Sequence, residues 1–294
     1  MHAPRDDRVL RGTRVVAALV VPFLLAAFGL WIVPSRTDWF AWTIRPDMTP
    51  MVMGAGYVAG AFFFARVLVA RCWHRVHLGF LPVTTFTIFM AVATLRNLDR
   101  FDHGRAAFWV WAGLYAATPV VVPAAWAWNR RRDPRELAPG DVRLPDAVRL
   151  ALAAAGVGQL VVALVLLVSP STMIDVWPWT VSPLTAAVLG GWFALPGVVA
   201  LMMAIDARWG AIRVTLDSQL LGLALILAAV GRAWDDFDRS NALTYVFTAG
   251  IALLLLALLA LRIGMDRRRC RPAETARAAR ASHPTTRARR PRRW

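Results

Sequence analysis

The residues with the greatest potential for chemistry belong to a segment that occurs twice. An Arg-x-x-Asp-x-Phe-Asp segment begins at Arg96 and recurs at Arg232, about 136 residues further along the chain. Carboxylates grouped in this way could bind a cation or a polar solute. The structural alternative is that Asp102 and Asp238 cap the helices that follow them, while the arginines extend to the membrane surface. The candidate ligand site comprises Arg96, Asp99, Asp102, His103, Arg232, Asp235 and Asp238.

A second group of charged residues lies within apolar stretches. Arg213 and Asp217 are four residues apart and share one face of a helix. Arg66 occupies a similar depth in an earlier stretch. A charged side chain at the bilayer centre costs roughly 2.5–3.5 kcal/mol on insertion scales, so these residues are candidates for proton or ion transfer. Their position near one end of each stretch favours a structural salt bridge over a relay.

The segment Cys72-x-His74-x-x-His77 contains residue types that bind zinc. A closed zinc site needs a fourth ligand at a suitable spacing, and none is nearby in the sequence. The corresponding segment of the second half reads Arg-Trp-Gly-Ala-Ile-Arg. The chain also has no phosphate-binding glycine loop, nucleophile elbow or HExxH motif. We therefore expect neither a metal site nor a cofactor, and an enzymatic activity is not indicated.

These residues belong to a chain dominated by apolar stretches, with 58% hydrophobic and 18% charged residues among 294. A helix of about twenty apolar residues crosses the roughly 30 Å hydrocarbon core of a bilayer. The sequence therefore predicts an all-α integral membrane protein with eight transmembrane helices. They are expected at Val15–Val33, Met51–Ala70, Gly79–Leu95, Ala106–Trp128, Val148–Val168, Val181–Ala204, Ala211–Gly231 and Ala242–Ile263.

The distribution of arginine predicts the orientation, because positively charged flanks are retained in the cytoplasm. The formal charge of +16 comes from arginine alone, since the chain has no lysine. Without the C-terminal tail, fourteen arginines flank one side and seven flank the other. We expect both termini in the cytoplasm of a bacterial cell with the chain in its inner membrane. Cys72 and Cys270 fall on this reducing side, so no disulfide is expected.

Further matches at nearly the same spacing indicate an internal repeat. Pro34-Ser35 recurs as Pro170-Ser171, and Trp42-Thr43 recurs as Trp179-Thr180. Each repeat has four helices, an even number, so the two are parallel and not inverted. The predicted organisation is a first four-helix repeat over 1–128, a cytoplasmic linker over 129–147, a second repeat over 148–263 and a disordered basic tail over 264–294.

The second half contains Trp-Thr-Val-Ser-Pro-Leu-Thr from Trp179, Gly-Gly-Trp-Phe from Gly190, and Arg208-Trp209 with Arg213. In these residues the chain resembles an uncharacterised family of multi-pass membrane proteins of high-GC bacteria with a repeated four-helix unit. The resemblance implies that architecture, and it implies no activity, substrate or catalytic residue.

Tryptophan and the small residues have expected roles in the membrane. An aromatic belt at the bilayer surface would hold Trp31, Trp39, Trp42, Trp177 and Trp179. Glycines on the second and sixth helices would allow close helix packing.

Two functions from different classes are consistent with these residues. The first is a permease for a small solute or ion that uses a cavity between the repeats. The second is a non-transporting scaffold or partner subunit, and a membrane-embedded enzyme is a weaker third. A polar cavity that reaches the membrane centre would favour the permease, whereas a dry interface packed by glycine and alanine would favour the scaffold.

The basic segment 262–294 is the clearest candidate for contact with a partner. It holds twelve arginines with only Asp266 and Glu274 opposing them. Each arginine close to an anionic membrane surface contributes about 1 kcal/mol, and the segment begins at the headgroups. We therefore expect anionic lipid headgroups as its partner, besides the bilayer itself, and expect no nucleic acid.

Overall fold

The computed structural model describes residues 7–282, with side chains through Arg269, and the regular elements of this part are all helices. Eight segments are long and apolar enough to cross a membrane, which confirms the predicted number and places. The first half contains α1 (Arg11–Ala27) continued by α2 (Gly29–Ile32), α3 (Met48–Val69), α4 (Phe80–Arg96) and α5 (Ala106–Arg130). The second contains α6 (Asp146–Val168), α8 (Pro183–Asp206), α9 (Trp209–Arg232) and α10 (Ala242–Ser282).

Short helices lie in the connections between these segments. Helices η1 (Trp73–Arg75) and η2 (His77–Gly79) precede α4, and η3 (Leu98–Arg100) follows it. Helix α7 (Pro170–Ile174) follows α6, and η4 (Trp234–Asp236) follows α9. We call the end of the bundle that holds residues 131–145 the linker end. The opposite end holds both Arg-x-x-Asp-x-Phe-Asp segments and is called the motif end.

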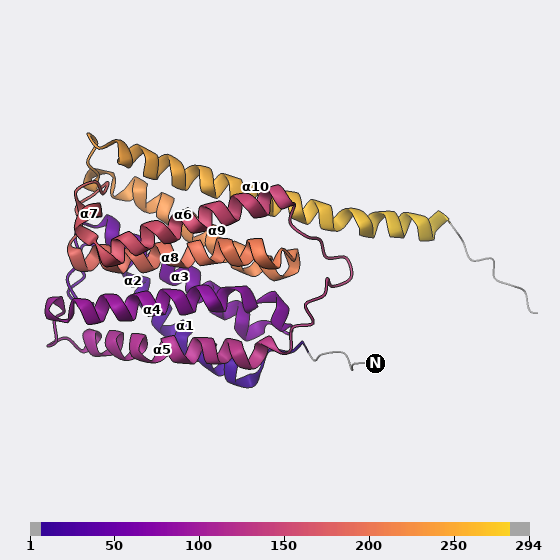
Figure 1. The fold of residues 1–294 in the computed structure, drawn as a ribbon, viewed down its shortest axis with the longest axis horizontal. Coiled ribbons are helices and arrows are strands. Elements are labelled where there is room, and N and C mark those ends of the chain that lie inside the picture. The colour runs from indigo at the N-terminus through magenta and orange to yellow at the C-terminus, as the bar shows by residue number, and fades with distance from the viewer. Residues whose placement is uncertain (1–6, 283–294) are drawn as a thin grey trace, which may run out of the picture.

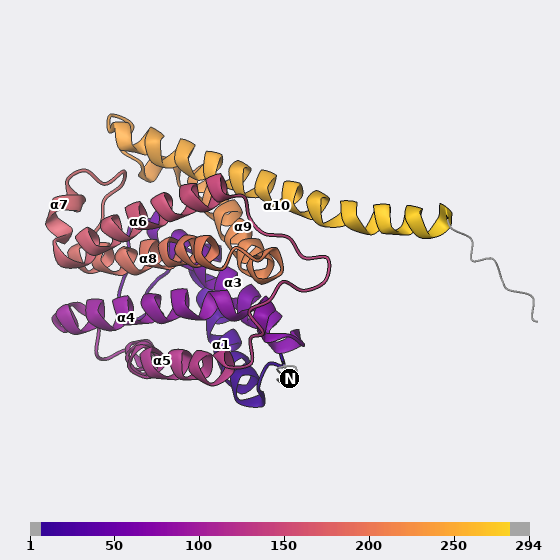
Figure 2. The same cartoon turned by 45° about the vertical axis from the view of Figure 1, so that its right-hand side comes forward.

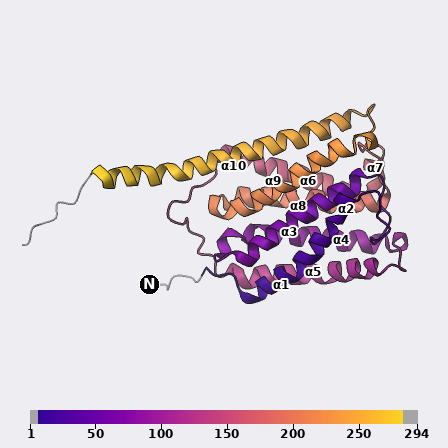
Figure 3. The ribbon, with the colours of Figure 1, turned by 180° about the vertical axis from the view of Figure 1, so that it is seen from behind.

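The long helices form two layers of four. One layer has the order α5, α4, α8, α6, and it faces the viewer in Figure 1. The other has the order α1, α3, α9, α10 and is seen from behind in Figure 3. Each half contributes two adjacent helices to each layer, so the halves meet where α4 packs on α8 and where α3 packs on α9.

The inner helices of each layer carry most of the buried surface. We compare the most apolar stretch of 18 residues in each span. In α3, α4, α8 and α9, between 44% and 56% of this stretch is buried. In the outer helices the buried share is between 0% and 22%. The outer helices are nevertheless just as apolar, which is the expected pattern where lipid covers their outer faces.

Glycine permits the closest helix crossing in the second half. A Cβ atom added to Gly156 of α6 would lie 2.7 Å from the carbonyl oxygen of Gly197 of α8. A Cβ atom added to Gly197 would in turn lie 3.1 Å from the carbonyl oxygen of Gly156. The two backbones are therefore in direct contact, as small residues allow in membrane helices.

Aromatic side chains fill the connections at the motif end. Trp42 packs edge-on against Phe101 with ring centroids 5.3 Å apart, and Trp179 packs against Phe237 at the same distance. These tryptophans were expected in an interfacial belt, but Trp42 is 4% exposed and Trp179 is 3% exposed. Trp177 is buried as well. The belt prediction is wrong for these three, because the loops fold inward over the helix ends.

Helix α10 is longer than the sequence indicated. It runs to Ser282, beyond Ile263 where the last span was expected to end, and it projects past the other helices at the linker end (Figures 1 and 2). Part of the segment expected to be a disordered tail is therefore helical. The remainder of that tail, together with the side chain of Cys270, lies outside the described residues.

Candidate functional site

Both repeated arginines bind the end of a helix in the opposite half. Arg96 donates hydrogen bonds to the carbonyl oxygens of the last two residues of α6, at 3.1 and 3.3 Å. Arg232 donates in the same way to the last two residues of α2, at 2.9 and 3.4 Å. Carbonyl groups at a helix C-terminus lack partners within the helix, and a cation suits them. The arginines therefore join the two halves, whereas the sequence suggested that they extend to the membrane surface.

The acidic residues of the candidate site have local partners. Asp102 forms an ion pair with Arg105 at 2.7 Å, and Asp235 forms one with Arg239 at 2.5 Å. Asp238 accepts a hydrogen bond from the backbone N–H of Ser240 at 2.9 Å. Asp99 is exposed. Among the described residues, no hydrogen bond or ion pair joins the acidic residues of one segment to those of the other.

The alternative role for Asp102 and Asp238 was to cap the helices that follow them, and the structure does not place them at the capping positions. The residue before α5 is Arg105, and Asp102 binds the turn that precedes it, at the backbone N–H of Gly104. At the start of α10 the side chain of Asn241 accepts from the backbone N–H of Leu243 at 2.9 Å. The aspartates therefore brace the loops before the helices and do not cap them. His103 packs its ring on Phe108, with centroids 4.6 Å apart.

The charged residues of α9 pair with α10. Asp217 binds the guanidinium of Arg262 at 2.6 Å, and Arg213 lies 3.5 Å from the carboxylate of Asp266. The expected pair between Arg213 and Asp217 is therefore replaced by two pairs that join neighbouring helices. Arg66 is exposed in the last turn of α3, and no ion pair includes it among the described residues.

A buried charge network at the linker end is the most concentrated group of ionisable residues. Arg208 donates to both carboxylate oxygens of Asp133 at 2.8 and 2.7 Å, and to both oxygens of Asp206 at 2.6 and 2.7 Å. His77 Nε2 lies 3.0 Å from Asp206 Oδ2. The four side chains are between 5% and 12% exposed. They come from η2, the linker and the turn after α8, so both halves contribute.

Both ring nitrogens of His77 lie close to oxygen atoms. Its Nδ1 is 2.9 Å from the backbone oxygen of His74. Its Nε2 is 3.0 Å from Asp206 Oδ2, on a carboxylate that Arg208 also binds. His77 therefore connects η2 to the end of α8.

The electrostatics of Asp133 agree with this arrangement. Burial alone would raise the pKa of Asp133, but hydrogen bonds from the Arg208 guanidinium and the Arg135 backbone N–H hold it below its usual range. For Arg208, burial alone would lower the pKa, but the two carboxylates raise it above its usual value. A cation already occupies the space between the carboxylates, so His77, Asp133 and Asp206 are explained without a metal ion, although their ligand atoms lie within 4.8 Å of one another.

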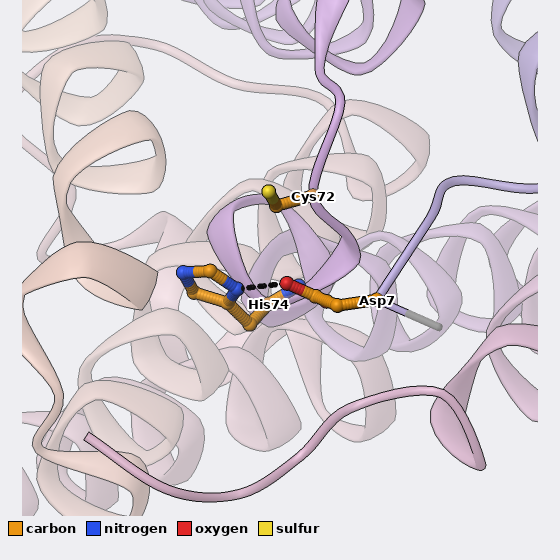
Figure 4. Close-up of side chains that lie close together, drawn as sticks. All are labelled: Asp7, Cys72 and His74. Carbon is orange, nitrogen blue, oxygen red and sulfur yellow. Dashed lines mark hydrogen bonds and ion pairs between the residues drawn. The ribbon is translucent and has the colours of Figure 1, made fainter. Parts of the chain in front are cut away.

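A second group of potential ligands lies beside this network. The ligand atoms of Asp7, Cys72 and His74 lie within 4.8 Å of one another, and Figure 4 shows the carboxylate of Asp7 facing the ring of His74. Asp7 also accepts from the backbone N–H of His74 at 3.0 Å. Burial alone would raise the pKa of Asp7, but these bonds from His74 lower it. Burial and the charge of Asp7 raise the pKa of the Cys72 thiol, which disfavours the thiolate that binds metals.

The second half contains a counterpart that explains Asp7. Asp141 accepts from the backbone N–H of Gly210 at 2.9 Å, where the linker meets the start of α9. Asp7 and Asp141 thus fix the same kind of connection in each half, and the second has neither histidine nor cysteine beside it. We therefore assign Asp7 to loop anchoring. Both groups of potential ligands contain residues of the Cys72-x-His74-x-x-His77 segment, which is visible in the sequence. The aspartates that complete each group lie far from this segment along the chain.

A cavity of about 170 Å³ lies between the halves, within the apolar part of the bundle. It is lined by α3, α4, α6, α8, α9 and α10, and most of its lining atoms are apolar. Three buried polar atoms among its lining residues have no hydrogen-bond partner: Gln159 Oε1, Trp192 Nε1 and Thr215 Oγ1. Buried polar groups without a partner are rare in native proteins. Each of these three atoms is enclosed by protein atoms and has almost no surface that a molecule in the cavity could reach.

The chain matches no protein-family model, no curated protein and no solved structure. The fold and the geometry of its sites are therefore the evidence for its class, which is an all-helical protein with eight potential membrane spans.

Proposed function

We propose that this protein is a multi-pass protein of the bacterial inner membrane that holds a small membrane-soluble molecule in the cavity between its halves. The volume and the predominantly apolar lining of that cavity carry the proposal. The volume of about 170 Å³ is close to the roughly 150 Å³ of a cavity that binds benzene. A single apolar ring meets these requirements.

The proposed architecture has two parallel repeats with both termini in the cytoplasm. It is supported by contacts that recur at corresponding places in both halves. The arginines at the ends of α4 and α9 bind the opposite half in the same manner. Trp42 with Phe101 and Trp179 with Phe237 make matching aromatic pairs. The start of α1 lies at the same end as the projecting part of α10, as an even number of spans requires (Figure 1).

The experiment compares small ring compounds as stabilisers of the purified full-length protein in detergent. We expect toluene to raise the melting temperature in a saturable manner and phenol to do so less, because the lining of the cavity is mostly apolar and transfer of a hydroxyl group into it is costly. Trp128→Phe, at a 69% exposed position, is the matched control and should behave as the wild type.

A variant that fills the cavity tests where the ring compounds bind. Ile226 lines the cavity on α9, and Ile226→Trp should abolish stabilisation by both compounds while Trp128→Phe retains it. Equal stabilisation of every variant would place the binding elsewhere and contradict the proposal. No stabilisation of the wild type would leave the scaffold as the better function.

The scaffold remains a second candidate because small residues also meet between the halves, where a Cβ atom added to Gly222 of α9 would lie 3.3 Å from the Cβ atom of Ala59 of α3. A permease for ions or polar solutes is less well supported, since the lining of the cavity between the halves is predominantly apolar. A permease for a membrane-soluble molecule is compatible with the same cavity.

We also retain the proposal that the basic C-terminal segment binds anionic lipid headgroups. Arg262, its first residue, is engaged with Asp217 and Asp266 and is not part of that surface. A peptide over residues 267–294 should bind vesicles that contain anionic lipid and dissociate as salt is added, because the attraction is screened. Equal binding to neutral vesicles would contradict it.

A further inference from the structure

A polar cavity of about 300 Å³ lies at the linker end, beside the charge network. His77, Asp133, Asp206 and Arg208 form part of its lining, and Arg208 binds both carboxylates. The other charged residues that line it are all arginines: Arg130, Arg135 and Arg143. Four guanidinium groups therefore line the cavity with only two carboxylates.

These three arginines have no carboxylate partner within the part of the chain that the structure describes. The guanidinium of Arg130 instead lies 5.1 Å from the centre of the Trp126 ring, which also lines the cavity. The two aspartates that line the cavity are each held by Arg208 through both carboxylate oxygens. No ion pair among the described residues therefore neutralises Arg130, Arg135 or Arg143.

The arginines are the groups that a ligand in this cavity can reach. Trp73 also lines the cavity, but it is 0% exposed, so its indole N–H is closed off by protein atoms. A ligand that carries both negative charge and several acceptor oxygens would satisfy the arginines.

We propose that this cavity binds a phosphate group. Arginine forms paired hydrogen bonds with phosphate oxygens, and several guanidinium groups around one cavity suit a group with oxygens in several directions. The volume is at the lower end of the range for small-molecule sites, which leaves room for a phosphate and a few attached atoms. The phosphate belongs either to a soluble ion or to the headgroup of an anionic lipid.

The test uses the full-length protein in nanodiscs of phosphatidylcholine. In the soluble arm, inorganic phosphate is titrated against sodium chloride at matched ionic strength, and the melting temperature is followed. In the lipid arm, phosphatidic acid replaces part of the phosphatidylcholine. A saturable rise with inorganic phosphate assigns a soluble ligand, whereas a rise with phosphatidic acid alone assigns a headgroup. No rise in either arm would overturn the proposal.

Variants distinguish phosphate binding in this cavity from a general attraction of phosphate to a basic protein. Arg143 is exposed at the rim, so Arg143→Gln is expected to fold, and the double variant Arg130→Gln/Arg143→Gln removes two of the three free guanidinium groups. We expect at least tenfold weaker binding in the double variant and an intermediate loss in the single one. Arg75→Gln is the control, because Arg75 is exposed on the neighbouring η1 and is not among the lining residues.

The pattern across variants decides the outcome. Unchanged binding in Arg143→Gln and in the double variant would overturn the proposal. An equal loss in Arg75→Gln would also overturn it, since the effect would then follow total charge.

Discussion

At the scale of single residues, two ion pairs of the same chemical type should differ widely in their effect on stability. Asp133 is 8% exposed where it binds Arg208, whereas Asp146 is 93% exposed where it binds Arg149. Loss of one partner from a buried pair leaves a desolvated charge and costs about 3–5 kcal/mol. An exposed pair contributes less than about 1 kcal/mol. Chemical denaturation in detergent should therefore show a large loss for Asp133→Ala and little change for Asp146→Ala.

The same carboxyl group should make stability depend on acid pH. The pKa of Asp133 is lower in the folded protein than its usual value near 3.9 in an unfolded chain. Its contribution is thus fully present above about pH 4 and declines as the pH falls towards the folded pKa. Between pH 6 and 3 the melting temperature of the wild type should fall more steeply than that of Asp133→Asn. A parallel fall in both proteins would show that Asp133 is not responsible.

The charge network could not be predicted from the sequence, because its residues are far apart in the chain and meet only in the folded protein. Asp133 belongs to a segment that reads as a linker, and Arg208 follows the left-handed turn at Ala207. The repeated arginines were predicted to belong to a ligand site or to extend to the membrane surface, whereas they bind backbone carbonyl groups of the opposite half. Carbonyl groups are present in every residue, so residue types could not indicate these partners.

At the scale of elements, the crossing of α6 and α8 should tolerate no side chain at Gly156. An added Cβ would meet the backbone of Gly197 at 2.7 Å, whereas nothing lies within 4 Å of one added to Gly158 on the same helix. Overpacking typically costs about 1–3 kcal/mol. Gly156→Val should lower the melting temperature strongly, and Gly158→Val should change it little. Similar decreases in melting temperature for both variants would mean that the low helix propensity of valine causes the loss of stability, and not a clash at the crossing of α6 and α8.

The helices themselves were readily predicted, because an apolar stretch of membrane length is a strong signal. The aromatic loops of the motif end were not, since tryptophan suits both a membrane surface and a loop core. Trp179 shows the difference: its indole donates to Thr49 of the other half at 2.8 Å and is buried there.

At the scale of the whole molecule, the orientation can be tested directly. We predict that a cytoplasmic reporter fused at Pro139 is active and that one fused at Ser240 is not, because arginine is concentrated at the linker end. A reporter that functions only after export should give the reverse pattern. Activity of the exported reporter at Pro139 would invert the orientation and place the phosphate-binding cavity outside the cell.

The halves contact each other outside the peptide connection, through Arg96, Arg232 and the packing of α4 on α8 and of α3 on α9. Gly140 is exposed in that connection, and we predict that fragments 1–139 and 140–294, produced together, will assemble and co-purify. Substituting both arginines by leucine should abolish the assembly of fragments while the intact chain still folds. Two identical four-helix chains related by a twofold axis could form the same reciprocal contacts. On the proposal that the two halves are repeats, the single chain has the arrangement of a twofold dimer whose two copies are joined by residues 131–145 and carry different sites.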